Sequence, residues 1–280
     1  MPFRSMFGSI ALAAAVIAGP SVAQQPFDES KYPAFAGQWF RIGPLGLFDP
    51  TKPSGLGQQA PLTSEYQKIY EANLADVARG GSGDDPVYTC IPEGMPRAMS
   101  LVLPMEIVVT RNTTYMMMEY LSMLRRIFTD GRDFPTDEEP SWMGYSIGKW
   151  IDEDGDGRYD VLEVETRNLK NPRTFDPSGL PVHKDGDTVV IERLYLDKAN
   201  PDMLYDQITT YDHALTRPWT VLRSMRREHK PIWVESICAE GNVHVSIAHR
   251  QYMLDGDGEL MPMMKDQPPP SLKNFNQTGK

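Results

Sequence analysis

The chain has 280 residues, of which 40 % are hydrophobic, and its 38 acidic and 28 basic side chains leave a net charge of −10. A chain of this length and apolar content can bury a large core, which excludes a disordered or fibrous protein. The acidic balance argues against a nucleic-acid-binding protein, because such proteins carry basic surfaces. Two cysteines are too few for a disulfide-rich scaffold or a four-cysteine zinc site.

Residues 1–23 have the features of a secretory signal peptide. Arg4 supplies the positive charge, residues 10–18 are apolar, and Ser21-Val22-Ala23 fits a cleavage site. The apolar run is too short to cross a bilayer, and no later stretch is long enough, so no membrane span is expected. The predicted location is periplasmic or extracellular. In such an oxidising compartment Cys90 and Cys238 are expected to form a disulfide.

The next segment, residues 24–98, is predicted to be an extended arm followed by one helix. Its first part is rich in Pro, Gly and Gln, which are typical of irregular chain. The helix is predicted over residues 64–79, where apolar side chains repeat at helical spacing. Ser64 with Gln67 has the pattern of a capping box at its start.

Residues 99–264 change to a β pattern and are predicted to form the barrel domain. The predicted strands are 99–110, 113–121, 123–129, 142–151, 159–167, 187–197, 203–212, 217–227, 232–238 and 243–253. No helical pattern separates them, so they are expected to be antiparallel. About ten such strands favour a closed, lipocalin-like barrel with room for a small ligand, and a β-sandwich is the alternative. Residues 265–280, Pro-rich and then polar, are expected to be disordered.

Residues 152–163 match a twelve-residue calcium loop. Carboxylates stand at loop positions 1, 3, 5, 9 and 12, and glycine stands at position 6. The spacing suits Ca²⁺, which takes six to eight oxygen ligands and needs a sharp turn at the glycine. The predicted ligands are Asp152, Asp154, Asp156, the carbonyl of Arg158, Asp160 and Glu163. The flanks look like strands, which places the loop at the tip of a β-hairpin. A solvated acidic turn without an ion is the alternative, and the turn at residues 185–187, which lacks the remaining ligands, is interpreted as a plain hairpin.

Charged side chains stand inside several apolar strand patterns. Examples are Arg125-Arg126, Glu192-Arg193 and the end of a strand at Asp212-His213. Buried charges must be paired, so one interpretation is a set of interior ion pairs that fix strand register. The other is the polar floor of a ligand cavity, in which a carboxylate and a histidine act as acid and base.

The second interpretation defines a candidate catalytic set. Its members are His183, Asp185, Glu119, Arg126, Arg132 and Asp212. His183 would carry the proton, with Asp185 orienting it, and one of the two arginines would hold an anionic oxygen. Glu119 or Asp212 would be a second base. The predicted aromatic walls of the ligand site are Trp142, Tyr145 and Trp219.

Long motifs of the chain resemble an uncharacterised family of secreted bacterial proteins with lipocalin-like barrels. The motifs are Cys90-Ile91-Pro92-Glu93-Gly94-Met95-Pro96-Arg97, residues 126–132, residues 140–150, Glu165-Thr166, Glu192-Arg193, residues 216–219 and Cys238-Ala239-Glu240. The resemblance covers residues 88–242 and implies the barrel fold and export, but no reaction. The acidic loop replaces a short turn of the relatives, and His183-Lys184-Asp185 replaces their His-Ser-Asp.

Three hypotheses about function follow. The leading one is a barrel that binds a small apolar or aromatic molecule, with or without cofactor-free isomerase, lyase or hydratase chemistry. The second is a non-catalytic carrier, and the third is a structural envelope protein with a calcium-stabilised hairpin. They differ in what the structure should contain: a cavity where His183 meets a carboxylate, an apolar cavity with a polar mouth, or a barrel filled by its own side chains.

Overall fold

The computed structural model describes residues 27–43, 60–241, 243–247, 250–264 and 266–269. The predicted signal peptide lies outside these residues, as does most of the C-terminal tail that was expected to be disordered. Both therefore stay predictions.

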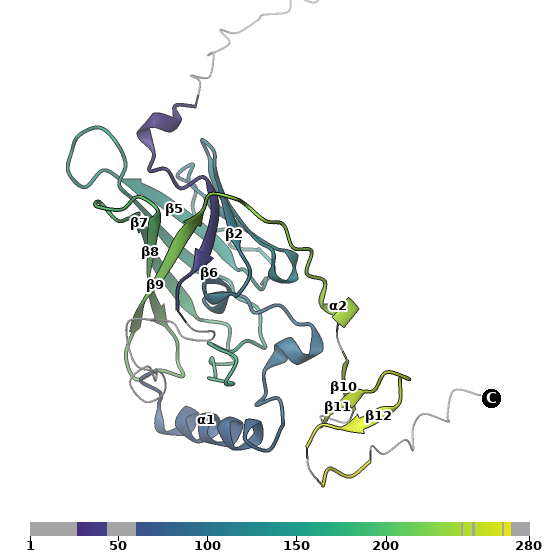
Figure 1. Cartoon of the computed structure of the whole chain (residues 1–280). Coiled ribbons are helices and arrows are strands. Elements are labelled where there is room, and N and C mark those ends of the chain that lie inside the picture. The colour runs from purple at the N-terminus through teal and green to yellow at the C-terminus, as the bar shows by residue number, and fades with distance from the viewer. Residues whose placement is uncertain (1–26, 44–59, 242, 248–249, 265, 270–280) are drawn as a thin grey trace, which may run out of the picture.

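Nine strands form one closed barrel (Figure 1). They are β1 (Gly37–Arg41), β2 (Met105–Val109), β3 (Thr113–Met118), β4 (Met123–Phe128), β5 (Tyr145–Ile151), β6 (Val161–Arg167), β7 (Val189–Leu196), β8 (Met203–Tyr211) and β9 (Trp219–Glu228). Consecutive strands are neighbours, and β1 pairs with both β2 and β9, which closes the barrel. The predicted mainly β barrel is confirmed, with nine strands in place of about ten.

One pair of strands contradicts the expectation of a wholly antiparallel barrel. β4 and β5 run parallel, with Ile127 opposite Ser146 and Phe128 opposite Ile147. A parallel pair needs a connection of about a dozen residues or more to bring the chain back to its starting end. Residues 129–144 provide that length without forming a helix. The absence of a helical pattern therefore did not exclude a parallel pair.

The predicted domain boundary at residue 99 also differs from the structure. β1 lies in the segment that was predicted to be an extended arm, and it supplies the strand that closes the barrel. Its Trp39 is buried, and the indole N–H donates to the carbonyl of Phe35 at 2.8 Å. β1 has only five residues and lies next to a Pro- and Gly-rich stretch, so its sequence is too short to predict a strand by itself.

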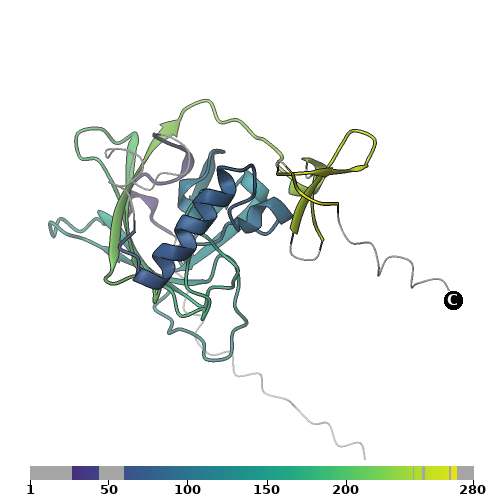
Figure 2. The ribbon, with the colours of Figure 1, turned by 90° about the horizontal axis from the view of Figure 1, so that it is seen from below.

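After β9 the chain leaves the barrel, which corrects the predicted boundary at residue 264. Residues 232–238 do not form the predicted strand but run as an extended segment into α2 (Cys238–Gly241). The predicted strand 243–253 is two strands, β10 (His244–Ile247) and β11 (Arg250–Leu254). With β12 (Leu260–Pro262) they form a separate three-stranded sheet beside the barrel (Figures 1 and 2).

The predicted helix is confirmed as α1 (Ser64–Val77), which lies across the lower end of the barrel (Figure 2). Its N-cap is Thr63 and not Ser64, because the Thr63 hydroxyl accepts the hydrogen bond of the Tyr66 N–H. Tyr66 and Tyr70 are the buried residues of the helix. The Tyr70 hydroxyl lies 3.0 Å from that of Ser178, so α1 packs on the connection between β6 and β7.

The barrel interior is packed by the protein's own side chains. Alternate residues of each strand point inward, as Val190, Glu192 and Leu194 do on β7. Methionine, which fills irregular spaces well, contributes Met95, Met99, Met105, Met116, Met118, Met123, Met143 and Met225 to the core. A filled interior is the feature that the structural-protein hypothesis predicts, so within the described residues a ligand site would lie at a barrel end or on the surface.

Candidate functional site

A pocket of about 460 Å³ lies where the Cys90–Cys238 disulfide joins the C-terminal segment to the barrel. We call it the disulfide pocket. Its apolar walls include Val87, Leu101, Val102, Leu121, Pro177 and Ile237. Its polar side chains include Asp85, Glu93, Arg97, Tyr120 and His244. Apolar walls with a few convergent polar groups are typical of small-molecule sites.

Two short helices place the charged groups of this pocket. Asp85 caps the 3₁₀ helix Pro86–Thr89, with its carboxylate accepting from the Val87 N–H at 3.1 Å. Arg97 begins the next one, Arg97–Ser100. The Arg97 guanidinium donates to both carboxylate oxygens of Asp85, at 2.8 and 3.1 Å. This bidentate pair is almost wholly buried, so its charges are matched within the protein.

Glu93 is the titratable group of the disulfide pocket with the strongest perturbation. It is 4 % exposed, and its Oε1 lies 3.6 Å from the Arg97 guanidinium. Burial raises the pKa of Glu93 to about 7, and the charge of Arg97 offsets only part of this effect. Its Oε2 is buried and has no hydrogen-bond partner among the described residues. A carboxyl group of this kind can exchange a proton near neutral pH.

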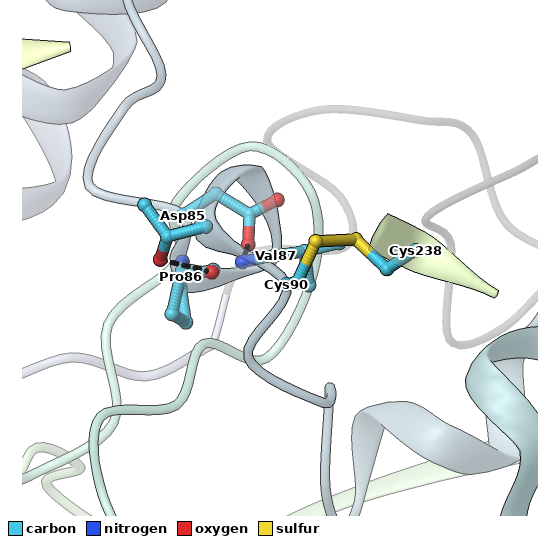
Figure 3. Close-up of a disulfide and its surroundings, with 6 residues drawn as sticks. Asp85, Pro86, Val87, Cys90 and Cys238 are labelled. Atoms are coloured by element: carbon cyan, nitrogen blue, oxygen red, sulfur yellow. Dashed lines mark hydrogen bonds between the residues drawn. A yellow bond between two sulfur atoms is a disulfide. The ribbon is translucent and has the colours of Figure 1, made fainter. Parts of the chain in front are cut away.

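The C-terminal segment, residues 232–238, is fastened to the rest of the protein at three points, of which the disulfide is the one at this pocket. The predicted disulfide between Cys90 and Cys238 is present and spans 148 residues of sequence (Figure 3). The Gln38 side chain donates to the carbonyl of Ile232 at 2.6 Å and accepts from its N–H at 3.0 Å. The Glu119 carboxylate accepts from the Val234 N–H. The backbone of Ile232 and the N–H of Val234 are therefore bonded by side chains rather than by a neighbouring strand.

A second cluster joins His183, Asp185 and His213. The Nδ1 of His183 lies 2.8 Å from Asp185 Oδ2, and the Nδ1 of His213 contacts the same oxygen. One ligand atom from each residue falls within 4.8 Å of the others. The predicted His183–Asp185 pair thus exists, and the turn interpreted as a plain hairpin contributes to a polar cluster. Asp185 has a pKa of about 2, because hydrogen bonds from both imidazoles and the Asp187 N–H outweigh the opposing effect of burial.

Asp212 supports this cluster instead of lying free to act as a base. Its Oδ1 accepts from the backbone N–H of His183 at 3.0 Å and of Ala214 at 2.8 Å. Its Oδ2 accepts from the Thr188 hydroxyl at 2.7 Å. Asp212 therefore ties the loop before β7 to the loop after β8.

The acidic loop lies at the tip of the β5–β6 hairpin, as predicted. Carboxylate oxygens of Asp152, Asp154 and Asp156 lie within 4.8 Å of one another and could hold a metal ion. Of the other predicted ligands, Asp160 accepts from the Glu153 N–H at 2.8 Å. Arg158 donates its backbone N–H to Asp156 at 2.8 Å.

Glu163 does not join the three carboxylates. It stands within β6, opposite Lys149, and forms an ion pair of 3.2 Å with Arg193 of β7. The strand pairing holds this residue in the sheet, so the twelfth position of the predicted loop does not close over the first five. The larger pocket of about 790 Å³ beside the loop is lined by several charged side chains, including Asp156 and Arg193.

The remaining predicted catalytic residues are dispersed. Arg126 points outward from β4 and is exposed. Arg132 is exposed and forms an ion pair of 2.6 Å with Asp130. Glu119 fastens the C-terminal segment, as described above. The structure gives these residues separate roles and does not bring them to His183.

The three predicted aromatic walls are dispersed as well. Tyr145 stacks with Phe128 at 5.0 Å between ring centroids. Trp219 is buried edge-to-face against Phe175. Trp142 carries the Lys170 ammonium 5.3 Å from its ring. They do not form one wall of the disulfide pocket.

One interior ion pair agrees with the first interpretation of the charged strands. Arg125 of β4 donates to both oxygens of Glu192 on β7, and the two side chains are 1 % and 0 % exposed. The Arg125 guanidinium also donates to Ser146 at 3.2 Å and Thr166 at 2.8 Å. Asp206 lies beside this pair, where burial and then the charge of Glu192 raise its pKa well above the usual range.

Sequence reasoning overlooked several of these residues for identifiable reasons. Glu93 lies in irregular chain and Arg97 begins a short 3₁₀ helix, so neither falls in a recognisable strand or α-helix pattern, although both belong to the Cys90–Arg97 motif that carried the family resemblance. The choice between Arg125 and Arg126 required the strand register. His213 follows a predicted strand, but its proximity to Asp185 depends on two separate loops.

No family model matches the chain, and no curated protein matches it significantly. The resemblance to secreted lipocalin-like proteins therefore stays a prediction. No helix within the described part of the chain combines the length and apolarity that a membrane span requires.

Proposed function

We propose that this protein binds a small, mostly apolar or aromatic molecule in the disulfide pocket. The observation that carries the proposal is the Oε2 atom of Glu93. It belongs to a side chain lining the pocket, it is buried, and it has no partner among the described residues. An unsatisfied buried polar atom costs about 1–3 kcal/mol, and a bound molecule with a hydrogen-bonding group would remove that cost.

The charges of the pocket narrow the class of ligand. Arg97 and Asp85 neutralise each other, so neither offers a free charge to a ligand. Glu93 is mostly neutral below its pKa of about 7 and then can donate a hydrogen bond. The matching ligand has an apolar body and one polar acceptor, such as a carbonyl or ether oxygen.

Native mass spectrometry of the gently purified protein is the direct test, because a retained small molecule would reveal the ligand class. Binding is also measurable with the neutral fluorophore N-phenyl-1-naphthylamine. Val102→Trp would fill the pocket, and Val108→Trp, at an exposed valine on β2, is the matched control. We expect the first variant to abolish fluorophore binding and the second to leave it unchanged. Equal binding by both variants would refute the proposed site.

The pocket also supports the enzymatic alternative, a cofactor-free isomerase, lyase or hydratase. The favouring observation is the pKa of Glu93, which is close to the value that a general base or acid needs at neutral pH. With the retained molecule as substrate, Glu93→Gln should abolish turnover while binding persists. Unchanged turnover in this variant would exclude Glu93 as the catalytic acid or base, and absence of turnover in the unmodified protein would support the carrier function instead.

We also propose that the hairpin loop binds Ca²⁺ as a structural ion. Asp152, Asp154 and Asp156 supply the clustered carboxylates that support this proposal. Calorimetric titration of chelator-stripped protein should show heat of Ca²⁺ binding, and an Asp154→Ala, Asp156→Ala variant should show none. Identical heats for both proteins would exclude the site.

Export to the periplasm or the extracellular space is the third part of the proposal. The Cys90–Cys238 disulfide supports it, because such bonds persist in oxidising compartments. Cell fractionation should recover the protein outside the cytoplasm, shortened at its N-terminus to begin near Gln24. A full-length cytoplasmic product would contradict this location.

A further inference from the structure

The His183, Asp185 and His213 cluster is unusual because two imidazoles converge on one carboxylate oxygen. The Nδ1 atoms of both histidines face Asp185 Oδ2, at 2.8 Å in the case of His183. One ligand atom of each residue lies within 4.8 Å of the other two. Ligand atoms of a tetrahedral zinc ion, with bonds of about 2.0–2.1 Å, are separated by about 3.3 Å. Both histidine nitrogens lie closer than this to Asp185 Oδ2, so the side chains would have to move apart to admit the ion.

The backbone around the three side chains is held mostly by bonds that do not use their ligand atoms. The exception is His183 Nδ1, which accepts from the Asp185 N–H at 3.2 Å, and an ion at this atom would displace that bond. Asp185 Oδ1 accepts from the Asp187 N–H at 3.0 Å, which orients the carboxylate and leaves Oδ2 facing the histidines. Asp212 accepts hydrogen bonds from the backbone N–H of His183 and from that of Ala214, which is the residue after His213. Such supporting contacts orient metal ligands in known sites.

The packing around His183 continues this support. The ring of Tyr66, on α1, lies against the His183 ring, with centroids 5.2 Å apart. Thr188, which donates to Asp212, itself accepts from the buried Arg173 guanidinium at 2.8 Å. The cluster therefore rests on a hydrogen-bonded base and on a helix, and its His213 side chain is exposed to solvent.

The surrounding charges favour a cation. Asp185, Asp187 and Asp212 all act electrostatically on His213 as negative charges. Two positive charges oppose them: the exposed Lys184, and the buried Arg173 guanidinium, which interacts with Asp185 and Asp212. The three carboxylates still outnumber these two cations. Two neutral imidazoles and one carboxylate would carry a single negative charge against the two positive charges of the ion.

We propose that His183, Asp185 and His213 bind a divalent transition-metal ion of the zinc class. The donor set of two nitrogens and one oxygen suits Zn²⁺, Ni²⁺ or Cu²⁺ and discriminates against Ca²⁺ and Mg²⁺, which prefer oxygen alone. The His213 side chain is 67 % exposed, so water completes the coordination. This site is separate from the disulfide pocket and from the acidic hairpin loop.

The test is a calorimetric titration of chelator-stripped protein without a polyhistidine tag, with Zn²⁺ as the probe. We expect one high-affinity zinc ion per chain, and no displacement of it by excess Ca²⁺. His213→Gln should weaken zinc binding at least about tenfold, since it removes one of three ligands. His229→Gln is the matched control, because His229 is 68 % exposed and forms a similar pair with Asp202, at 2.8 Å.

The outcomes are distinct. Loss of affinity in His213→Gln and in Asp185→Asn, with full affinity in His229→Gln, would establish the site. Absence of zinc binding to the unmodified protein would overturn the proposal and leave a hydrogen-bonded His–Asp cluster only. Equal affinity of the His213→Gln and His229→Gln variants would also overturn it, and would indicate adventitious surface binding. Thermal unfolding with and without Zn²⁺ gives a second readout, because binding to the folded state raises Tm.

Discussion

The Arg97 guanidinium lies 3.6 Å from Glu93, yet the pKa of Glu93 is raised to about 7. The reason is that Arg97 is committed to Asp85, with two hydrogen bonds of 2.8 and 3.1 Å. The desolvation of Glu93 therefore outweighs the attraction of a cation that is already neutralised. The result is an acid that titrates near neutral pH at the wall of a pocket.

This relationship predicts a specific dependence of stability on pH. A carboxyl with a raised pKa in the folded state stabilises the fold fully below its unfolded pKa, near 4.5, and that contribution disappears as pH rises through about 7. Between these pH values the native protein should lose at most about 3 kcal/mol of unfolding free energy from this group. Urea denaturation of Glu93→Gln should show a flatter profile over this range. Glu71→Gln, on the exposed face of α1, should keep the native profile, and a flat native profile would contradict the prediction.

Two adjacent arginines on β4 should differ sharply in their effect on stability. Arg125→Met would leave Glu192 buried without its partner, so we expect a loss of about 3–5 kcal/mol. Arg126→Ala changes an exposed side chain and should cost no more than about 0.5 kcal/mol. Denaturant unfolding measures both values. Similar costs at the two positions would contradict the burial of the Arg125–Glu192 pair, and a larger cost at Arg126 would mean that the strand faces the other way.

Removing the disulfide should weaken both the fold and the pocket. A Cys90→Ser, Cys238→Ser variant should lose roughly 2–4 kcal/mol of unfolding free energy, because the bond closes a long loop. It should also bind N-phenyl-1-naphthylamine more weakly, since residues 236–238 form one wall of the pocket. When the protein without substitutions is unfolded in denaturant, its thiols should be alkylated only after the disulfide has been reduced. Retained fluorophore binding in the variant would show that the segment stays in place through Gln38 and Glu119 alone.

The glycine of the Cys90–Arg97 motif should not tolerate a side chain. Gly94 has φ +65°, and an added Cβ would lie 2.5 Å from the carbonyl oxygen of Trp142. Gly131 has φ +79° with open space around it, so it carries the conformational strain without the clash. Gly131→Ala should cost about 1–2 kcal/mol. Gly94→Ala should cost at least about 1 kcal/mol more, and equal costs in thermal unfolding would argue against the close approach.

The β pattern identified most barrel strands, because alternation of apolar and polar residues marks a strand with one buried face. The helix over residues 64–79, the hairpin around the acidic loop and the cysteine pairing were also predictable from local signals. The parallel β4–β5 pair and the closing strand β1 were not, because strand direction and barrel closure depend on contacts between distant segments.

The candidate sites, like the fold, have some features that the sequence predicts and others that only the tertiary structure reveals. The sequence by itself determined the mainly β class, the extended segments, the acidic loop and the two cysteines that can pair, because each depends on neighbouring residues or on composition. Only the tertiary structure decided that Arg125 rather than Arg126 faces inward, that His213 meets Asp185, and that Glu93 lies buried beside an arginine already paired with Asp85. These properties arise from burial and from contacts between chain segments that are far apart in sequence. Desolvation and charge pairing exist only once those segments have packed together.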